Sequence, residues 1–133
     1  MSYKKIFYKK KLIGELITAK TRVNSTVFYS PKESSFQFGL FAHSKGFFEL
    51  PHYHKKIKRK IYDLQQVLFV QKGELSVNFY NNSKKIIKRI NLKKGDALNI
   101  VGGVHSVKVK KNCQCLTVKQ GPFISDKEDK VNV

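Results

Sequence analysis

The sequence predicts a single all-β domain. Short runs of Val, Ile, Phe, Leu and Tyr recur about every ten residues between turn-forming residues, a pattern typical of β-sandwiches and barrels. The chain has 133 residues, 41% of them hydrophobic, and this length supports one modest core. We therefore expect one domain over residues 1–133, with N-terminal strands within 11–30, a core at 36–120 and a C-terminal tail at 121–133.

The expected strands follow from these apolar runs, taken in chain order. Two strands precede the core, and eight more make it up, each bounded by polar or turn-forming residues. They are 11–18, 27–30, 36–42, 47–53, 65–71, 74–80, 85–91, 97–101, 104–109 and 114–119.

The turns between these strands contain Gly, Pro, Asn or Ser, which adopt the backbone angles that turns require. They read SPKESS, HSKG, QKGE, YNNSKK, LKKGD and KKNCQ. Within QKGE we expect a hairpin that turns at Lys72 and Gly73. The segment KKNCQ is expected to separate the last two strands.

The chain is strongly basic. It contains 27 Lys and Arg against nine Asp and Glu, for a net charge of +18, which favours anionic partners such as phosphorylated metabolites or nucleotide sugars. The cations are distributed over several expected turns instead of one tail or helix. A small anionic metabolite is therefore the expected partner, and nucleic acid is not.

No apolar run approaches the roughly 18 residues of a membrane-spanning helix, so we expect no membrane partner and a cytoplasmic location. Cys113 and Cys115 stand in C-x-C spacing within an apparent strand and share a face, a geometry in which a mutual disulfide is awkward. We expect both to be reduced, packed thiols, in keeping with a cytoplasmic protein.

Two of the four histidines are separated by one residue. In a strand, His52 and His54 would project from the same face with Tyr53 on the other. Two neighbouring imidazoles can hold a metal ion or exchange protons, whereas they repel each other when both are charged. The pair is therefore the first candidate for a functional site.

Two motifs in the chain resemble those of the cupin superfamily, small jelly-roll barrels. The first is Gly46, five residues, then His52 and His54, with Gln66 six residues before Gly73; the second is GDALNIVGGVH, which ends at His105. The chain departs from the family pattern in three places. The spacer between His54 and Gln66 has eleven residues, Gln66 replaces the usual Glu, and Val101 replaces the usual Pro.

The resemblance implies an all-β cupin double-stranded β-helix that binds a divalent metal. Its ligands would be His52, His54 and His105, with Gln66 as a neutral oxygen donor, and Zn, Fe, Mn and Ni all suit such a set. The implied activity is Lewis-acid or acid–base chemistry on a small anionic, carbohydrate-derived metabolite. Because open sheet edges need covering, we expect a homodimer formed through an edge strand near the N-terminus.

The same residues are also similar to the cupin-type sugar-nucleotide 3,4-ketoisomerases, which need no metal. That resemblance implies His52 and His54 as the acid–base pair, with Tyr53 or Tyr62 as proton donors. Basic residues would hold the diphosphate of the substrate. A third possibility is a non-catalytic barrel that binds a small anion or a polyanion, and the three alternatives stay open on the sequence alone.

Overall fold

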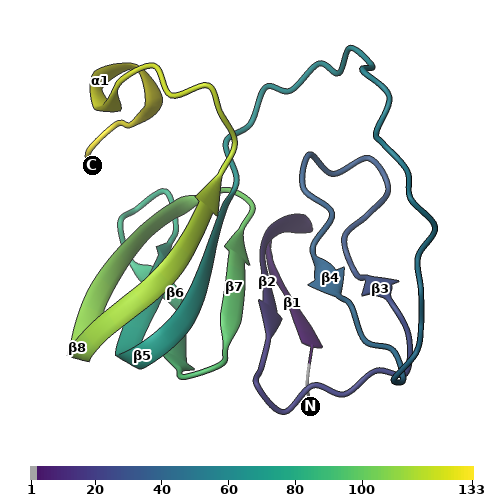
Figure 1. The fold of residues 1–133 in the computed structure, drawn as a ribbon. Helices are drawn as coiled ribbons and strands as arrows, with labels where there is room; N and C mark the ends of the chain where they lie inside the picture. The colour runs from purple at the N-terminus through teal and green to yellow at the C-terminus, as the bar shows by residue number, and fades with distance from the viewer. Residues whose placement is uncertain (1–2) are drawn as a thin grey trace.

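Strands account for nearly all the regular structure of the computed structural model, which describes residues 3–133 (Figure 1). The predicted all-β class is confirmed. Residues 1 and 2, which the predicted domain includes, lie outside the described range. The elements are β1 (Tyr3–Tyr8), β2 (Lys11–Ile17), β3 (Val27–Phe28), β4 (Gly39–Leu40), β5 (Gln66–Tyr80), β6 (Ile86–Lys93), β7 (Ala97–Ile100), β8 (Val104–Lys119) and the helical turn α1 (Asp126–Asp129).

Strand β5 organises a curled antiparallel sheet that forms half of a barrel. β8 pairs along one edge of β5, while β7 pairs with its first half and β6 with its second half. β2 extends the sheet from β7, and β1 follows β2. β3 and β4 pair only with each other, as a separate two-stranded sheet.

The core lies on the concave face of the curled sheet. Leu75, Val77 and Phe79 of β5 are almost completely buried, because alternate residues of a strand share a face. Leu92 of β6 and Leu98 of β7 pack into the same cluster. Each such side chain contributes about 1.5–3 kcal/mol when it is fully buried, so burial of this cluster stabilises the sheet.

The predicted hairpin at Lys72 and Gly73 is wrong, because β5 continues through both residues. Gly73 has a φ of +82°, and a Cβ there would collide with the backbone carbonyl of Asn112. The pairing of β5 with β8 shifts register around this point. Gly73 therefore forms a β-bulge where both strands bend, which a glycine can do as readily as it forms a turn. For the same reason β8 continues through KKNCQ.

The strands predicted at 27–30 and 36–42 are only two residues long, as β3 and β4, and two more differences concern β1 and residues 47–53. β1 was not expected, because its turn to β2 is made by Lys9 and Lys10, whose φ values of +49° and +64° are more typical of Asn or Gly. The predicted strand at 47–53 has no pairing partner among residues 3–133. It belongs to residues 41–65, the β4–β5 segment, which runs along the outside of the molecule without regular structure (Figure 1).

The helical turn α1 contains four residues, so in the part of the chain that the structure describes there is no helix with the length and hydrophobicity to cross a membrane. Ser125 caps it, since its hydroxyl accepts a hydrogen bond from the backbone N–H of Glu128 at 3.1 Å.

Candidate functional site

The predicted site residues fall into two groups. Gln66 and His105 lie on the curled sheet, on β5 and β8. His52, with its neighbours, lies on the β4–β5 segment, which passes β3 and β4 on the side of the molecule opposite β8 (Figure 1). Among the described residues, no metal-type cluster of His, Cys, Asp and Glu joins the two groups.

Gln66 and His105 line one hollow of about 920 Å³, together with Tyr80, Ser106 and the tail at 129–133. The Nδ1 of His105 lies 3.0 Å from the backbone carbonyl of Gly103. Because a carbonyl can only accept, Nδ1 carries the proton, and Nε2 of the neutral ring is left with a lone pair. His105 thus offers a base or a ligand atom at the mouth of the half-barrel.

Two other polar groups line the same hollow. The hydroxyls of Tyr80 and Ser106 are 2.7 Å apart. Gln66 donates from Nε2 to the Thr117 hydroxyl at 2.9 Å, which fixes the orientation of its amide. Tyr80 and Ser106 were missed in the sequence because no motif includes them, although Ser106 directly follows His105 in the chain.

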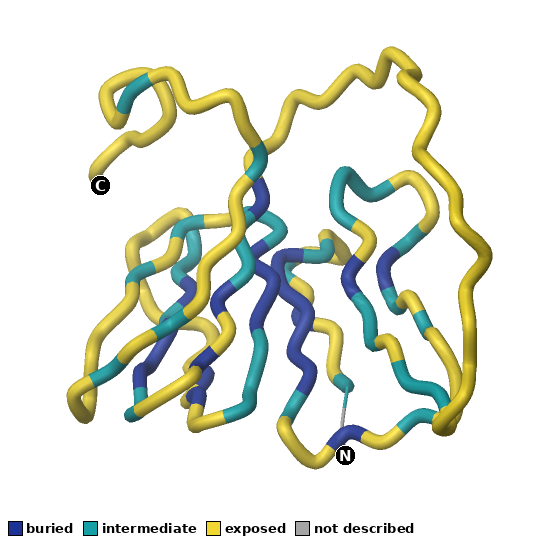
Figure 2. Tube along the Cα trace, viewed as in Figure 1, coloured by how far each residue is buried: buried dark blue, intermediate teal, exposed yellow. Residues whose placement is uncertain are grey.

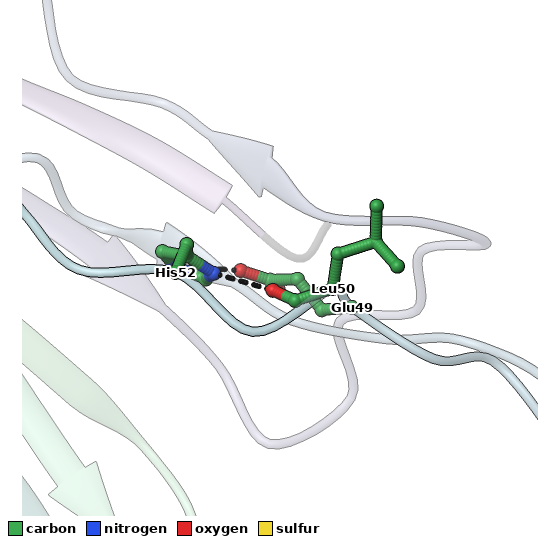
Figure 3. Close-up of polar contacts among 3 residues, drawn as sticks. All are labelled: Glu49, Leu50 and His52. Carbon is green, nitrogen blue, oxygen red and sulfur yellow. Dashed lines mark hydrogen bonds and ion pairs between the residues drawn. The ribbon is translucent and has the colours of Figure 1, made fainter.

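The second group is centred on His52. Its Nδ1 lies 2.8 Å from the Leu50 carbonyl and its Nε2 lies 3.2 Å from Oε1 of Glu49 (Figure 3). Both partners are acceptors, so only the doubly protonated ring can satisfy both contacts at once. Glu49 precedes His52 by three residues, and this spacing was the only sequence signal for the contact.

His54 completes this group. Its ring centroid lies 5.4 Å from that of His52, with the two rings inclined by 72°. Both histidines are exposed. The predicted proton donors Tyr53 and Tyr62 lie on the same segment, with 86% and 93% of their side chains exposed. The segment thus carries two adjacent imidazoles and two phenols into solvent.

The predicted metal centre stays a prediction, because its ligands lie on two separate parts of one chain, the β4–β5 segment and strands β5 and β8. Over residues 3–133, no three His, Cys, Asp or Glu side chains are grouped in a way that could hold a metal ion. His52 and His54 supply two neighbouring imidazoles, but Gln66 and His105 belong to the separate hollow.

The six residues after His54 carry a concentrated positive charge. Lys55, Lys56, Lys58, Arg59 and Lys60 are all exposed, and within the described residues none of them forms an ion pair with a carboxylate. Such a run of free cations next to two imidazoles attracts an anionic ligand to the same segment.

Both ends of the β4–β5 segment are attached to the β3–β4 side of the molecule. His43 stacks on Phe47 with ring centroids 3.7 Å apart and lies 2.9 Å from the Thr26 hydroxyl through Nε2. At the other end, Asp63 accepts hydrogen bonds from Ser35 and from Gln65 Nε2. Burial opposes ionisation of Asp63, but these hydrogen bonds outweigh it and lower the pKa of the carboxyl.

Cys113 and Cys115 are free thiols with Sγ atoms 3.3 Å apart, as expected for reduced, packed cysteines. Burial, followed by contact with Cys113, raises the pKa of Cys115 to about 11. A thiol with so little thiolate at neutral pH is a poor nucleophile, so neither cysteine is assigned a role in the site.

Comparisons with known proteins identify no relative of this chain. No protein-family model matches it, and neither the curated proteins nor the solved structures gave a significant match. The resemblance to cupins therefore depends on the residues of the two motifs alone.

Proposed function

We propose that this protein is a cupin-like enzyme that isomerises a small anionic, carbohydrate-derived metabolite, of the sugar-nucleotide class, by acid–base chemistry at His52 and His54. The observation that carries the proposal is the distance of 5.4 Å between the two imidazole rings, which lie beside a run of unpaired cations. The jelly-roll barrel is part of the proposal, and the curled half-barrel supports it.

Two imidazoles at this separation suit proton transfer between adjacent carbons of a keto sugar. In the proposed reaction His54, as the neutral base, removes the proton from the carbon next to the ketone, while the protonated His52 donates to the ketone oxygen to give an enediol. The second half reverses the roles across the neighbouring carbon. His52 takes the proton of the adjacent hydroxyl, and His54 returns its proton to the former carbonyl carbon, so the ketone moves by one position without any redox change.

The cations of residues 55–60 support the anionic part of the proposed substrate. Lys and Arg are the usual partners of phosphate groups, through charge-assisted hydrogen bonds. Because these side chains follow His54 directly in the chain, a bound diphosphate would place the attached sugar near the two imidazoles. This positioning converts a bimolecular encounter into an oriented one.

Incubation with 4-keto-6-deoxy sugar nucleotides in deuterated water tests the proposal. The wild-type protein is expected to exchange the proton next to the ketone and to form the 3-keto isomer, which NMR detects. His52→Asn and His54→Asn are each expected to lower the rate by about 10²–10⁴-fold, the usual contribution of a general acid or base. Ser83→Ala, in an exposed turn away from the β4–β5 segment, is the control and is expected to keep the wild-type rate.

Two results would count against this function. Absence of exchange in the wild-type protein, with the nucleotide still bound, would favour a non-catalytic anion-binding barrel. Exchange that stops when a chelator is added and returns with a divalent ion would favour the metal-dependent reaction instead.

A further inference from the structure

We propose that the β4–β5 segment of one copy of this chain lies along the open edge of β8 in a second copy, so that each site is built from two chains. This inference goes beyond the acid–base function and rests on it only for the role given to His52 and His54. The occupant of the open sheet edge is thus a second copy of the same protein.

Most of the β4–β5 segment is exposed and is not covered by the rest of the described chain. Every residue from 44 to 64 is exposed (Figure 2), and the structure gives residues 48–64 no backbone–backbone hydrogen bond to any other described residue. Even so, it carries a dense set of large apolar side chains, which are Phe47, Phe48, Leu50, Tyr53, Ile57, Ile61, Tyr62 and Leu64. An apolar stretch of this length on a protein surface marks a contact site.

β8 has an edge that lacks a strand partner. Among the described strands it pairs only with β5, so its other edge has no partner along the strand. Val107 and Val109 pair with the buried Val77 and Leu75 and share their face, yet Val107 is 49% and Val109 is 58% exposed. A long strand edge that has no partner can accept another strand, even though lysines such as Lys108 and Lys110 restrict which strand it accepts.

The two sequences match in an antiparallel register. With Leu50 opposite Val107, Phe48 lies opposite Val109 and His52 lies opposite His105, so that apolar residues meet and the imidazoles gather on the concave face. On the other face, Glu49 lies opposite Lys108, which pairs opposite charges. A shift by one residue would reverse the faces and remove all these matches.

This register also keeps the basic residues 55–60 away from Lys108 of β8. The basic residues 55–60 continue past the end of β8 at Val104, toward the hollow that contains His105, instead of lying beside Lys108. Glu49 and His52 project to opposite faces of a strand, so docking replaces the contact of Glu49 with His52 by a contact with Lys108. The ring of His52 is then free to face the hollow.

The attachments of the segment explain why the partner is a second copy. His43 is held at Thr26, and Asp63 is held at Ser35. Between these two contacts the segment passes along the β3–β4 side of the molecule (Figure 1), and it reaches its own β8 only at the Lys119 end, where Gln66 pairs with that strand. Two copies related by a twofold axis can each cover the β8 of the other, which closes both edges in one symmetric assembly.

Disulfide trapping tests the pairing between chains. Leu50→Cys and Val107→Cys are introduced into separate chains that both carry Cys113→Ala and Cys115→Ala, and the two chains are co-expressed and oxidised. A disulfide-linked species of twice the single-chain mass, containing one chain of each kind, is the expected product. Ile87→Cys replaces Val107→Cys in the control, because Ile87 is an exposed apolar residue of β6, and no linked species is expected.

Native mass spectrometry of the unmodified protein supplies an independent measurement if the cysteine-free background does not fold. A single-chain mass at micromolar concentration would overturn the proposal. So would formation of the disulfide within one chain when Leu50→Cys and Val107→Cys are placed together, since the segment would then cover its own β8. Neither measurement uses catalysis, so the two proposals can fail separately. Disulfide-linked chains that do not isomerise the sugar nucleotide would refute the proposed function alone. Isomerisation by a protein with a single-chain mass would refute the pairing between chains alone.

Discussion

The hydroxyl of Ser30 donates a 3.0 Å hydrogen bond to Oε1 of the completely buried Glu15. The same hydroxyl oxygen accepts a 2.8 Å hydrogen bond from the backbone N–H of Phe38, while Tyr3 and Asn99 also donate to the Glu15 carboxylate. Ser30 therefore connects the small β3–β4 sheet to β2. Burial and the neighbouring Glu15 raise the pKa of Tyr3 above its usual value, so this phenol stays a donor.

Ser30→Ala should destabilise the protein, because it leaves the N–H of Phe38 without its partner and removes one donor from a buried carboxylate. The expected loss is about 1–3 kcal/mol in the free energy of unfolding, measured by urea denaturation. Ser83→Ala, in an exposed turn, is the control and should change this energy by less than about 0.5 kcal/mol. Equal effects of the two substitutions would show that Ser30 does not hold the sheets together.

Gly73→Ala should be far more damaging than Gly46→Ala. Both glycines have a positive φ, of +82° and +93°, but a Cβ on Gly46 meets open space whereas one on Gly73 meets the backbone of β8. Gly46→Ala should cost about 1–3 kcal/mol from its backbone conformation alone, and Gly73→Ala should cost about 1–3 kcal/mol more for the overlap. Thermal unfolding of the two variants checks the difference, and similar melting temperatures would argue against the bulge.

The fold class and several strands could be predicted because they depend on local pattern. β2, β6 and β7 have apolar runs bounded by turn residues, and the structure contains each of them close to the expected range. The continuity of β5 could not be predicted. Whether Gly73 makes a hairpin or a bulge is decided by the carbonyl of Asn112 on a strand that is distant in sequence, and no local signal reports it.

In the candidate site, too, the local features could be predicted and the long-range ones could not. The spacing of His52 and His54 predicted a pair of neighbouring imidazoles, and their rings lie 5.4 Å apart. The meeting of this pair with His105 stays a prediction, because the strand expected at 47–53 has no partner within the chain. A strand needs hydrogen-bond partners as well as a suitable pattern, and the pattern alone does not say from which chain they come.

Cys115 should react slowly with iodoacetamide. Its pKa of about 11, raised by burial and by Cys113, leaves little thiolate at pH 8, and the rate should rise until the pH passes about 11. Cys113→Ala removes one cause of the raised pKa and should therefore increase the rate at pH 8. Mass spectrometry of the alkylated protein over time gives both rates, and a rate that is already maximal at pH 8 would contradict the raised pKa of Cys115.

Asp63 should contribute to stability only while it is ionised. The pKa of Asp63 is lower in the folded protein than in the unfolded chain. Its contribution to stability is therefore complete above the ordinary carboxyl pKa of about 3.9, and this contribution is lost as the pH falls through the pKa of the folded protein. The stability difference between wild type and Asp63→Asn should shrink on acidification below about pH 4. Glu33→Gln is the control at an exposed carboxyl, and a difference that does not change with pH would exclude this role for Asp63.

The long pairing of β5 with β8 has a consequence for synthesis of the protein. Residues 66–80 find their partner along one whole edge only in residues 104–119, so a nascent chain cannot complete its sheet until residues 104–119 have left the ribosome. Until then the apolar face of β5 is exposed to neighbouring nascent chains, a situation that promotes aggregation. A chain that ends before β8 should accumulate in inclusion bodies, whereas a chain that ends just after Gln120 keeps every strand of the sheet.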